Sequence, residues 1–128
     1  MPSDQVRAIA NKLVENCRNG NETAGLDEYY ADDAVSVEAG PTPTQPDPAT
    51  KGLDGIKGKH AWWHENMTVH SSSLDGPFFQ GEDRFAVYFK FDAEDNNSKM
   101  RHEMSEVGLY TVKDGKIVRE EFFYNMEM

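Results

Sequence analysis

The first apolar residues of the chain recur three and four positions apart, which is the spacing of a helix with one buried face. This stripe consists of Val6, Ile9, Ala10, Leu13, Val14 and Cys17. Ser3 and Asp4 are favourable N-cap residues and Asn19-Gly20-Asn21 is typical of a helix end, so the pattern predicts a helix over residues 4–18. A shorter stripe after it predicts a second helix over residues 22–31.

Further along the chain, apolar and polar residues alternate, which is typical of strands with one buried face. A strand is predicted over residues 34–39 and a third helix over residues 54–66, and the proline-rich residues 40–48 between them are expected to form an exposed loop and a lid. The later strands are predicted over residues 68–74 with 78–80, 84–92, 99–112 and 116–124. Short turns join these strands, so we expect one α+β domain over residues 1–128, an antiparallel sheet with three N-terminal helices packed on one face.

Charge narrows the classes of partner. The 128 residues include 13 Lys and Arg against 23 Asp and Glu, a formal net charge of −10. Such a field repels nucleic acid, anionic membranes and polyphosphorylated substrates, so we expect a small apolar molecule, neutral or cationic, as the ligand. The N-terminal residues lack the pattern of a secretion signal and no segment is apolar enough to span a membrane, which predicts a cytoplasmic protein. The single cysteine, Cys17, excludes an internal disulfide.

Three segments carry a resemblance to a known family: Tyr30-Ala31-Asp32-Asp33-Ala34, residues 52–56 at the start of the third helix, and the hairpin at residues 114–117. With the order of elements, they make nearly the whole chain resemble the nuclear transport factor 2-like superfamily, nearest to its SnoaL-like and ketosteroid-isomerase-like branches. The resemblance implies a cone-shaped barrel of a strongly curved antiparallel sheet around a deep apolar pocket, often in a homodimer. The superfamily contains isomerases, cyclases, dehydratases, hydrolases and binding proteins, so the fold alone does not decide the function.

Glu38 is the first catalytic candidate. Aligned through the Tyr30 segment, it falls where ketosteroid isomerases carry the carboxylate that moves a proton between carbons. The donors that assist that carboxylate are absent, because their positions fall near Leu13 or Val14 and near Gly108, whose side chains cannot donate. The cyclase pattern is also absent, since its histidine and aspartate align with Gly108 and Phe122.

The penultimate strand offers a different polar set. Alternation combined with the alignment points Met100, His102, Met104, Glu106, Gly108, Tyr110 and Val112 toward the cavity, unless a β-bulge reverses the order. His102 and Glu106 are candidates for an acid–base pair beside Glu38, with a surface salt link as the alternative. The expected substrate-binding residues are Trp63, Tyr88, Met104, Tyr110, Phe122 and Tyr124. Residues of the opposite parity, Val107, Leu109 and Thr111, are expected to form a homodimer face.

Histidines offer a weaker signal. His60 and His64 are four positions apart on the third helix, a spacing that can place two imidazoles on one metal ion, and His70 is a distant third. No metalloprotease motif is present, so we expect structural or surface histidines and neither a metal nor a cofactor.

Three hypotheses follow from the sequence. The first is an isomerase, cyclase or related lyase that acts on an apolar carbonyl or polyketide-like molecule with a carboxylate base. The second is a binding module in which the same cavity holds a hydrophobic ligand without reaction. The third is an interaction protein that dimerises through the open face of the sheet.

Overall fold

The computed structural model describes residues 2–41 and 45–124. One helix, α1 (Asp4–Arg18), begins at Ser3, whose Oγ accepts a hydrogen bond from the Val6 amide at 3.2 Å. Its predicted bounds and its predicted buried stripe are confirmed, with Cys17 at the partly buried end of that stripe. The third predicted helix is also present, as α3 (Leu53–Asn66), and its Ile56 is fully buried.

The second helix is shorter than predicted. A 3-10 turn at Glu22–Gly25 leads into a single α-helical turn, α2 (Leu26–Tyr29), and the chain enters strand β1 (Tyr30–Val37) four residues before the predicted start. Tyr30 is already paired with Ile117 in the sheet. The reason is long-range: the buried hydroxyl of Tyr30 reaches Glu120, a contact that helical periodicity cannot reveal.

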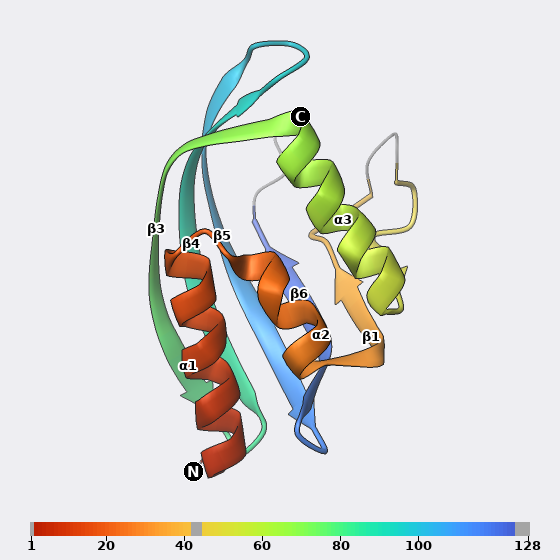
Figure 1. The fold of residues 1–128 in the computed structure, drawn as a ribbon, viewed down its shortest axis with the longest axis vertical. Helices are drawn as coiled ribbons and strands as arrows, with labels where there is room; N and C mark the ends of the chain where they lie inside the picture. Colours follow the sequence, from red (N-terminus) through yellow and green to blue (C-terminus); the bar gives the residue numbers. More distant parts are fainter. Residues whose placement is uncertain (1, 42–44, 125–128) are drawn as a thin grey trace.

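Six strands form one sheet in the order β2-β1-β6-β5-β4-β3 (Figure 1). Besides β1 they are β2 (Ala49–Lys51), β3 (Met67–Gln80), β4 (Arg84–Asp95), β5 (Arg101–Lys113) and β6 (Lys116–Phe123). The sheet is mixed, because β1 runs parallel to β6, which corrects the wholly antiparallel expectation. A parallel pair needs a long connection, and here α3 and the β3–β5 meander supply it. The predicted loop at residues 40–48 lies partly outside the described residues.

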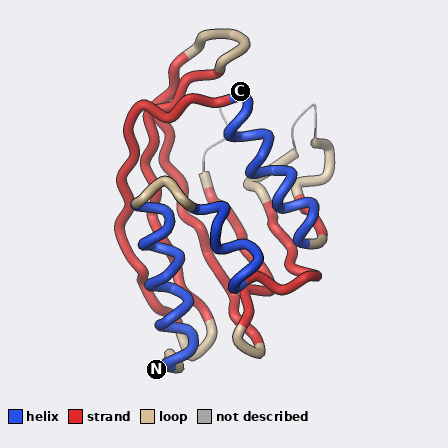
Figure 2. The backbone as a smooth tube through the Cα atoms, in the orientation of Figure 1, coloured by secondary structure: helices blue, strands red, loops and turns tan. Residues whose placement is uncertain are grey.

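The helices all lie on one face of the sheet, and β3, β4 and β5 bend toward α3 at one end (Figures 1 and 2). The curved, cone-like sheet agrees with the predicted cone-shaped barrel, but it does not close, and the core lies between the helices and the sheet. The predicted alternation in β4 holds, with Phe85, Val87 and Phe89 buried on the inner face. Pairing between β4 and β5 runs without a shift from Arg84–Thr111 to Glu94–Arg101, so no bulge disturbs the parity of β5 along β4. The predicted inward residues from His102 to Tyr110 therefore share one face of β5. Met100 precedes β5 and is exposed, so it does not belong to that face, and the pairing of β5 with β6 shifts between Thr111 and Val112.

The turns between strands have the conformations that their residues favour. Asp114 and Gly115 have φ of 52° and 78°, the left-handed conformation that a tight hairpin between twisted strands needs. In β3 the register shifts between Asp75 and Phe78, which confirms the predicted interruption of that strand. None of the helices in the described part of the chain is long and apolar enough to cross a bilayer.

Candidate functional site

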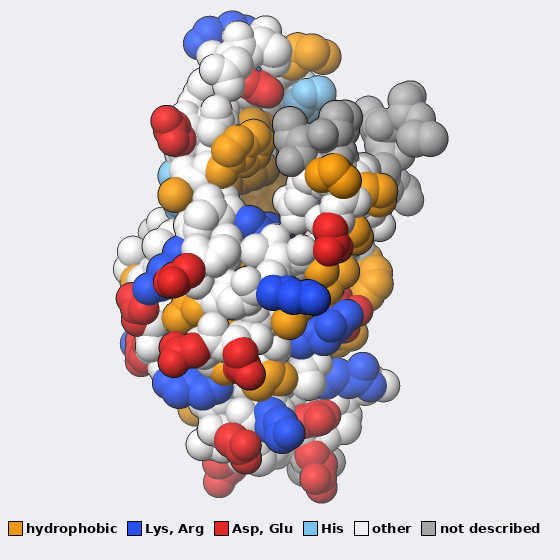
Figure 3. Space-filling view, turned by 90° about the vertical axis from the view of Figure 1, so that its right-hand side faces the viewer, with side chains coloured by type: hydrophobic (Ala, Val, Ile, Leu, Met, Phe, Trp, Pro, Cys, Tyr) orange, Lys and Arg blue, Asp and Glu red, His pale blue; other side chains and the backbone are white. Residues whose placement is uncertain are grey.

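Two hollows meet where β6 ends. The inner cavity, of about 1230 Å³, lies on the helix side of the sheet, and a smaller outer hollow of about 500 Å³ opens on the other face. Figure 3 shows a hollow with hydrophobic side chains on its walls. The inner and outer hollows share Glu38, Glu106, Phe122 and Tyr124 in their linings. These four side chains therefore form the wall between them.

Most of the predicted site residues line the inner cavity: Glu38, Trp63, Met104, Glu106, Tyr110, Phe122 and Tyr124. They come from α3, β5 and β6, and from the residues just after β1 and β6. Trp63 packs on Phe91 with ring centroids 6.0 Å apart, whereas its neighbour Trp62 is exposed at the cavity rim. This arrangement agrees with the opposite directions expected of adjacent helical residues.

Two predicted residues lie elsewhere. Tyr88 pairs with Val107 on the outer face and lines the outer hollow. His102 is exposed and lines neither hollow, and no hydrogen bond joins it to Glu106 within the described residues. Four residues of strand separate the two side chains by about 13 Å, so parity alone does not bring them together.

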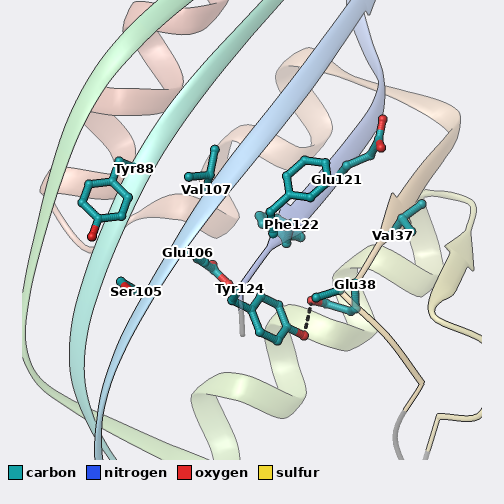
Figure 4. A pocket seen from close by; sticks show the side chains of 11 residues that line it. Val37, Glu38, Tyr88, Ser105, Glu106, Val107, Glu121, Phe122 and Tyr124 are labelled. Atoms are coloured by element: carbon teal, nitrogen blue, oxygen red, sulfur yellow. Dashed lines mark hydrogen bonds between the residues drawn. The ribbon is translucent and has the colours of Figure 1, made fainter. Parts of the chain in front are cut away.

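Lys59, which the sequence did not single out, is the centre of a hydrogen-bonded network at the cavity wall. Its Nζ forms a 2.5 Å ion pair with Glu38 Oε1 and donates to Ser36 Oγ at 2.8 Å. Tyr124 donates its hydroxyl proton to Glu38 Oε2 at 3.0 Å (Figure 4). Both oxygens of Glu38 therefore have partners.

Glu120 lies behind this network with only 3% of its surface exposed. It accepts hydrogen bonds from Ser36 Oγ, at 2.7 Å, and from the Tyr30 hydroxyl. Burial raises the pKa of Glu120, and the two hydrogen bonds oppose that rise. One signal for it was present in the sequence, because Glu120 shares the parity of Phe122, and an inward carboxylate needs buried partners.

Glu106 differs from the other two carboxyl groups. It forms no hydrogen bond or ion pair with any residue in the described ranges, although it lies in the same wall. Burial, and then the negative charge of Glu38, raise the pKa of Glu106 from 4.5 to about 7. A carboxyl group with this pKa is present in both forms near neutral pH and can accept or give a proton.

The hydroxyls of Tyr110 and Tyr124 and the thiol of Cys17 stay protonated near neutral pH. Burial, and then the charge of Glu38, raise the pKa of Tyr124 to about 12, so its hydroxyl remains a donor. Burial raises the pKa of Tyr110 as well. Cys17 lines the cavity, but burial raises its thiol pKa to about 12, which disfavours a nucleophilic thiolate.

The histidines of α3 lie at the cavity lining near the 3-10 turn. His60 Nδ1 and His64 Nε2 both contact Thr23 Oγ1, at 3.4 and 3.3 Å, and His70 contacts Glu94 at 3.0 Å. Burial lowers the pKa of His60. Within residues 2–41 and 45–124, no three His, Cys, Asp or Glu side chains are grouped as metal ligands would be.

Comparisons with known proteins agree with this fold. The model of the SnoaL-like domain family matches residues 5–124. A structure from Mesorhizobium loti, provisionally named a SnoaL-like polyketide cyclase and carbohydrate phosphatase, is 39% identical and superposes with a TM-score of 0.85, covering 93% of this chain and 98% of its own. A protein from Jannaschia sp. CCS1 with the same provisional cyclase name is 14% identical, with a TM-score of 0.73 over 94% of this chain and 85% of its own. A provisionally named isomerase from Bacillus subtilis is 15% identical, with a TM-score of 0.67 over 95% and 84%. No curated protein sequence matches the chain.

Proposed function

The chain belongs to the SnoaL-like domain family, and on that premise we propose that its inner cavity binds a small apolar carbonyl compound and transfers a proton on it by general acid–base chemistry. The cyclase part of the name of the Mesorhizobium loti protein supports a reaction of this class, since a cyclase forms a new bond within a carbon skeleton.

The observation that carries the proposal is the placement of Glu106. This carboxyl group has no described partner, yet it faces a cavity whose walls include Trp63, Phe91 and Phe122. Apolar walls bind an apolar substrate and exclude water, which strengthens the basicity of a carboxylate. Glu106 is therefore the base that removes a proton from a carbon next to the carbonyl group.

Stabilisation of the resulting enolate falls to the neighbouring donors. As the C–H bond breaks, its electron pair moves into the C–C bond and negative charge develops on the carbonyl oxygen. The Lys59 ammonium group keeps one proton beyond those that face Glu38 and Ser36 and can donate it directly, whereas the single hydroxyl proton of Tyr124 becomes available only when it leaves Glu38. In an isomerisation, Glu106 returns the proton to the γ carbon of a conjugated dienolate. In a cyclisation, the enolate carbon attacks a second carbonyl carbon, and the alkoxide that forms takes the proton from Glu106.

This assignment changes the role expected of Glu38. Resemblance to the isomerases placed the base there, but Lys59 and Tyr124 occupy both of its oxygens. Glu38 instead holds the two donors at the wall. Tyr124 lies between Glu38 and Glu106 in Figure 4, and the charges of both carboxyl groups affect its hydroxyl.

The test is proton exchange at carbon. Apolar cyclic and aromatic ketones are incubated in D2O with the protein, and deuterium uptake is followed by mass spectrometry. Glu106→Gln is expected to slow the catalysed exchange by about 10²–10⁴-fold. Glu103→Gln, an exposed carboxylate on the outer parity of the same strand, serves as the matched control and keeps the wild-type rate. Wild-type exchange in Glu106→Gln contradicts the assignment.

A non-catalytic binding module is the second candidate, favoured by the full occupancy of Glu38. It predicts that ketones bind in the cavity while no deuterium enters them. Equal affinities of wild type and Glu106→Gln for the same ketone, with no exchange in either, support this candidate over the enzyme.

We also propose that the outer face pairs with a second copy of the chain. Val107, Leu109 and Thr111 lie on this face, opposite to the parity of Glu106, and the exposed Phe78 and Phe123 extend it. Apolar patches of this kind mark interaction surfaces. Light scattering is expected to give a dimer for the wild type and a monomer for Val107→Lys, and a monomeric wild type contradicts the proposal.

A further inference from the structure

Ser36 is fully buried in β1 between a carboxylate and an ammonium group. Its Oγ lies 2.7 Å from Glu120 Oε2 and 2.8 Å from Lys59 Nζ. A serine hydroxyl carries a single proton, and a lysine ammonium group can only donate. The hydroxyl therefore donates to Glu120 and accepts from Lys59, so the direction of both hydrogen bonds follows from the chemistry of the three groups.

Glu120 maintains this direction from behind the wall. The Tyr30 hydroxyl donates to one of its oxygens and Ser36 to the other, and the side chain is 3% exposed. A proton on Glu120 Oε2 would point at the hydroxyl proton of Ser36. That hydroxyl proton cannot turn toward Lys59 instead, because the ammonium group there is also a donor. The arrangement thus uses Glu120 as an acceptor on both oxygens, and this keeps the acceptor side of Ser36 open to Lys59.

Lys59 has a flexible four-carbon stem, and its location depends on what its ammonium group contacts. The contacts are Ser36, Glu38 and the ring of Phe122, whose centroid is 5.6 Å from Nζ. Ser36 is the only one of these three that lines neither hollow. A ligand in the cavity can displace Lys59 from Glu38 or Phe122, but it does not reach Ser36.

We propose that Ser36, oriented by Glu120, is a positioning residue that holds Lys59 against Glu38 and thereby leaves the proton-transfer role to Glu106. The role of Glu106 rests on the proposed function. The positioning of Lys59 does not, because it is a property of the protein without substrate.

Titration of Glu106 reports where Lys59 lies. Three charged groups shift the pKa of Glu106: Glu38, which follows β1, Lys59 from α3 and Glu120 from β6. The charge of Glu106 in turn raises the pKa of Tyr110, on its own strand, and of Tyr124, which follows β6. Lys59 lowers the pKa of Glu106, whereas Glu38 and Glu120 raise it. Departure of Lys59 from the wall should therefore raise this pKa above about 7.

If Ser36 had only a structural role, its substitution would change the pKa of Glu106 in the opposite direction. Burial is the largest cause of the raised pKa of Glu106. A substitution that loosens the wall admits water, reduces that cause and lowers the pKa toward the ordinary value of a glutamate. The sign of the change in the pKa of Glu106 therefore distinguishes the two interpretations of Ser36.

The experiment is a pH titration of the glutamate carboxyl carbons by ¹³C NMR on the substrate-free protein, with Glu106→Gln to assign the signal. Lys59→Gln is expected to raise the midpoint of Glu106 by about one pH unit, and Ser36→Ala by a smaller amount in the same direction. The double variant should match Lys59→Gln alone, because Ser36 acts through Lys59. Ser71→Ala, at an exposed serine outside both linings, should leave the midpoint unchanged.

An unchanged or lowered midpoint in Ser36→Ala overturns the proposal, as does an equal rise from Ser36→Ala in the Lys59→Gln background. If Ser36→Ala does not fold, Ser36→Cys replaces it, since a thiol is close in volume and a weak acceptor, and the same upward shift is required. No substrate enters the measurement, so failure of the proton-exchange assay and failure of this positioning role are distinguishable.

Discussion

Lys59 and Glu38 form a 2.5 Å ion pair between α3 and the end of β1, with 22% and 23% of their side chains exposed. The pair occupies the position where resemblance to the isomerases predicts a free base. Glu106 has no such partner among the described residues, which is why we propose it as the reactive carboxyl group.

Glu106 should make the stability of the protein depend on pH. Its pKa is raised from 4.5 to about 7 on folding, so the folded state binds the proton more tightly than the unfolded state. The stabilisation is fully present below about pH 4.5 and is lost as the pH rises through about 7. Relative to the wild type, Glu106→Gln should gain roughly 3 kcal/mol between these limits. Urea unfolding of both proteins at several pH values measures the difference, and parallel curves contradict the prediction.

The two adjacent tryptophans should report differently on ligand binding. Trp63 packs on Phe91 inside the cavity, whereas Trp62 has 58% of its surface exposed. A neutral hydrophobic dye that quenches tryptophan only on contact and occupies the cavity should quench Trp63 more strongly. Quenching should persist in Trp62→Phe and largely disappear in Trp63→Phe, as measured by fluorescence titration. The reverse pattern would place the dye on the surface.

Tyr30 and Tyr29 allow a controlled test of the hydrogen bond to the buried carboxylate of Glu120. Both are buried, but Tyr30 donates to Glu120, whereas the Tyr29 hydroxyl accepts from Asn16 at 3.2 Å. Hydrogen bonds to charged groups contribute more, so Tyr30→Phe should lower the free energy of unfolding by about 1.5–3 kcal/mol and Tyr29→Phe by about 0.5–1.5 kcal/mol. Equal losses in chemical denaturation would indicate that Glu120 finds another donor.

Ile56 anchors α3, the helix that carries Lys59, to the core. It is 0% exposed and belongs to the cluster formed with the sheet and α1. Ile56→Ala should lower the free energy of unfolding by about 2–5 kcal/mol, and Ile56→Val by about 0.5–1.5 kcal/mol, because the cavity left behind is smaller. Thermal and urea unfolding measure both values. A loss below about 1 kcal/mol for Ile56→Ala, roughly half the usual minimum, would mean that the core is not closed around this helix.

The features predicted correctly depend on short stretches of chain. The helix over residues 4–18 follows from its apolar spacing and from Ser3, and the hairpin at Asp114-Gly115 follows from residues that tolerate positive φ. Alternation along β5 correctly assigned Met104, Glu106 and Tyr110 to one face, because side chains of an unbroken strand alternate strictly. The spacing of apolar residues along a helix and their alternation along a strand are local properties, so a single sequence is enough to detect them.

Contacts between distant segments could not be obtained in this way. Ser36 and Glu120 are 84 positions apart, and Tyr124 and Glu38 are 86 apart, yet each pair shares a hydrogen bond. The parallel pairing of β1 with β6 brings the first pair together and starts β1 at Tyr30 instead of extending α2. Lys59 joins them only because α3 packs across β1. Parity places three carboxyl groups toward one cavity, but their partners in the folded chain determine which of them remains free to exchange a proton.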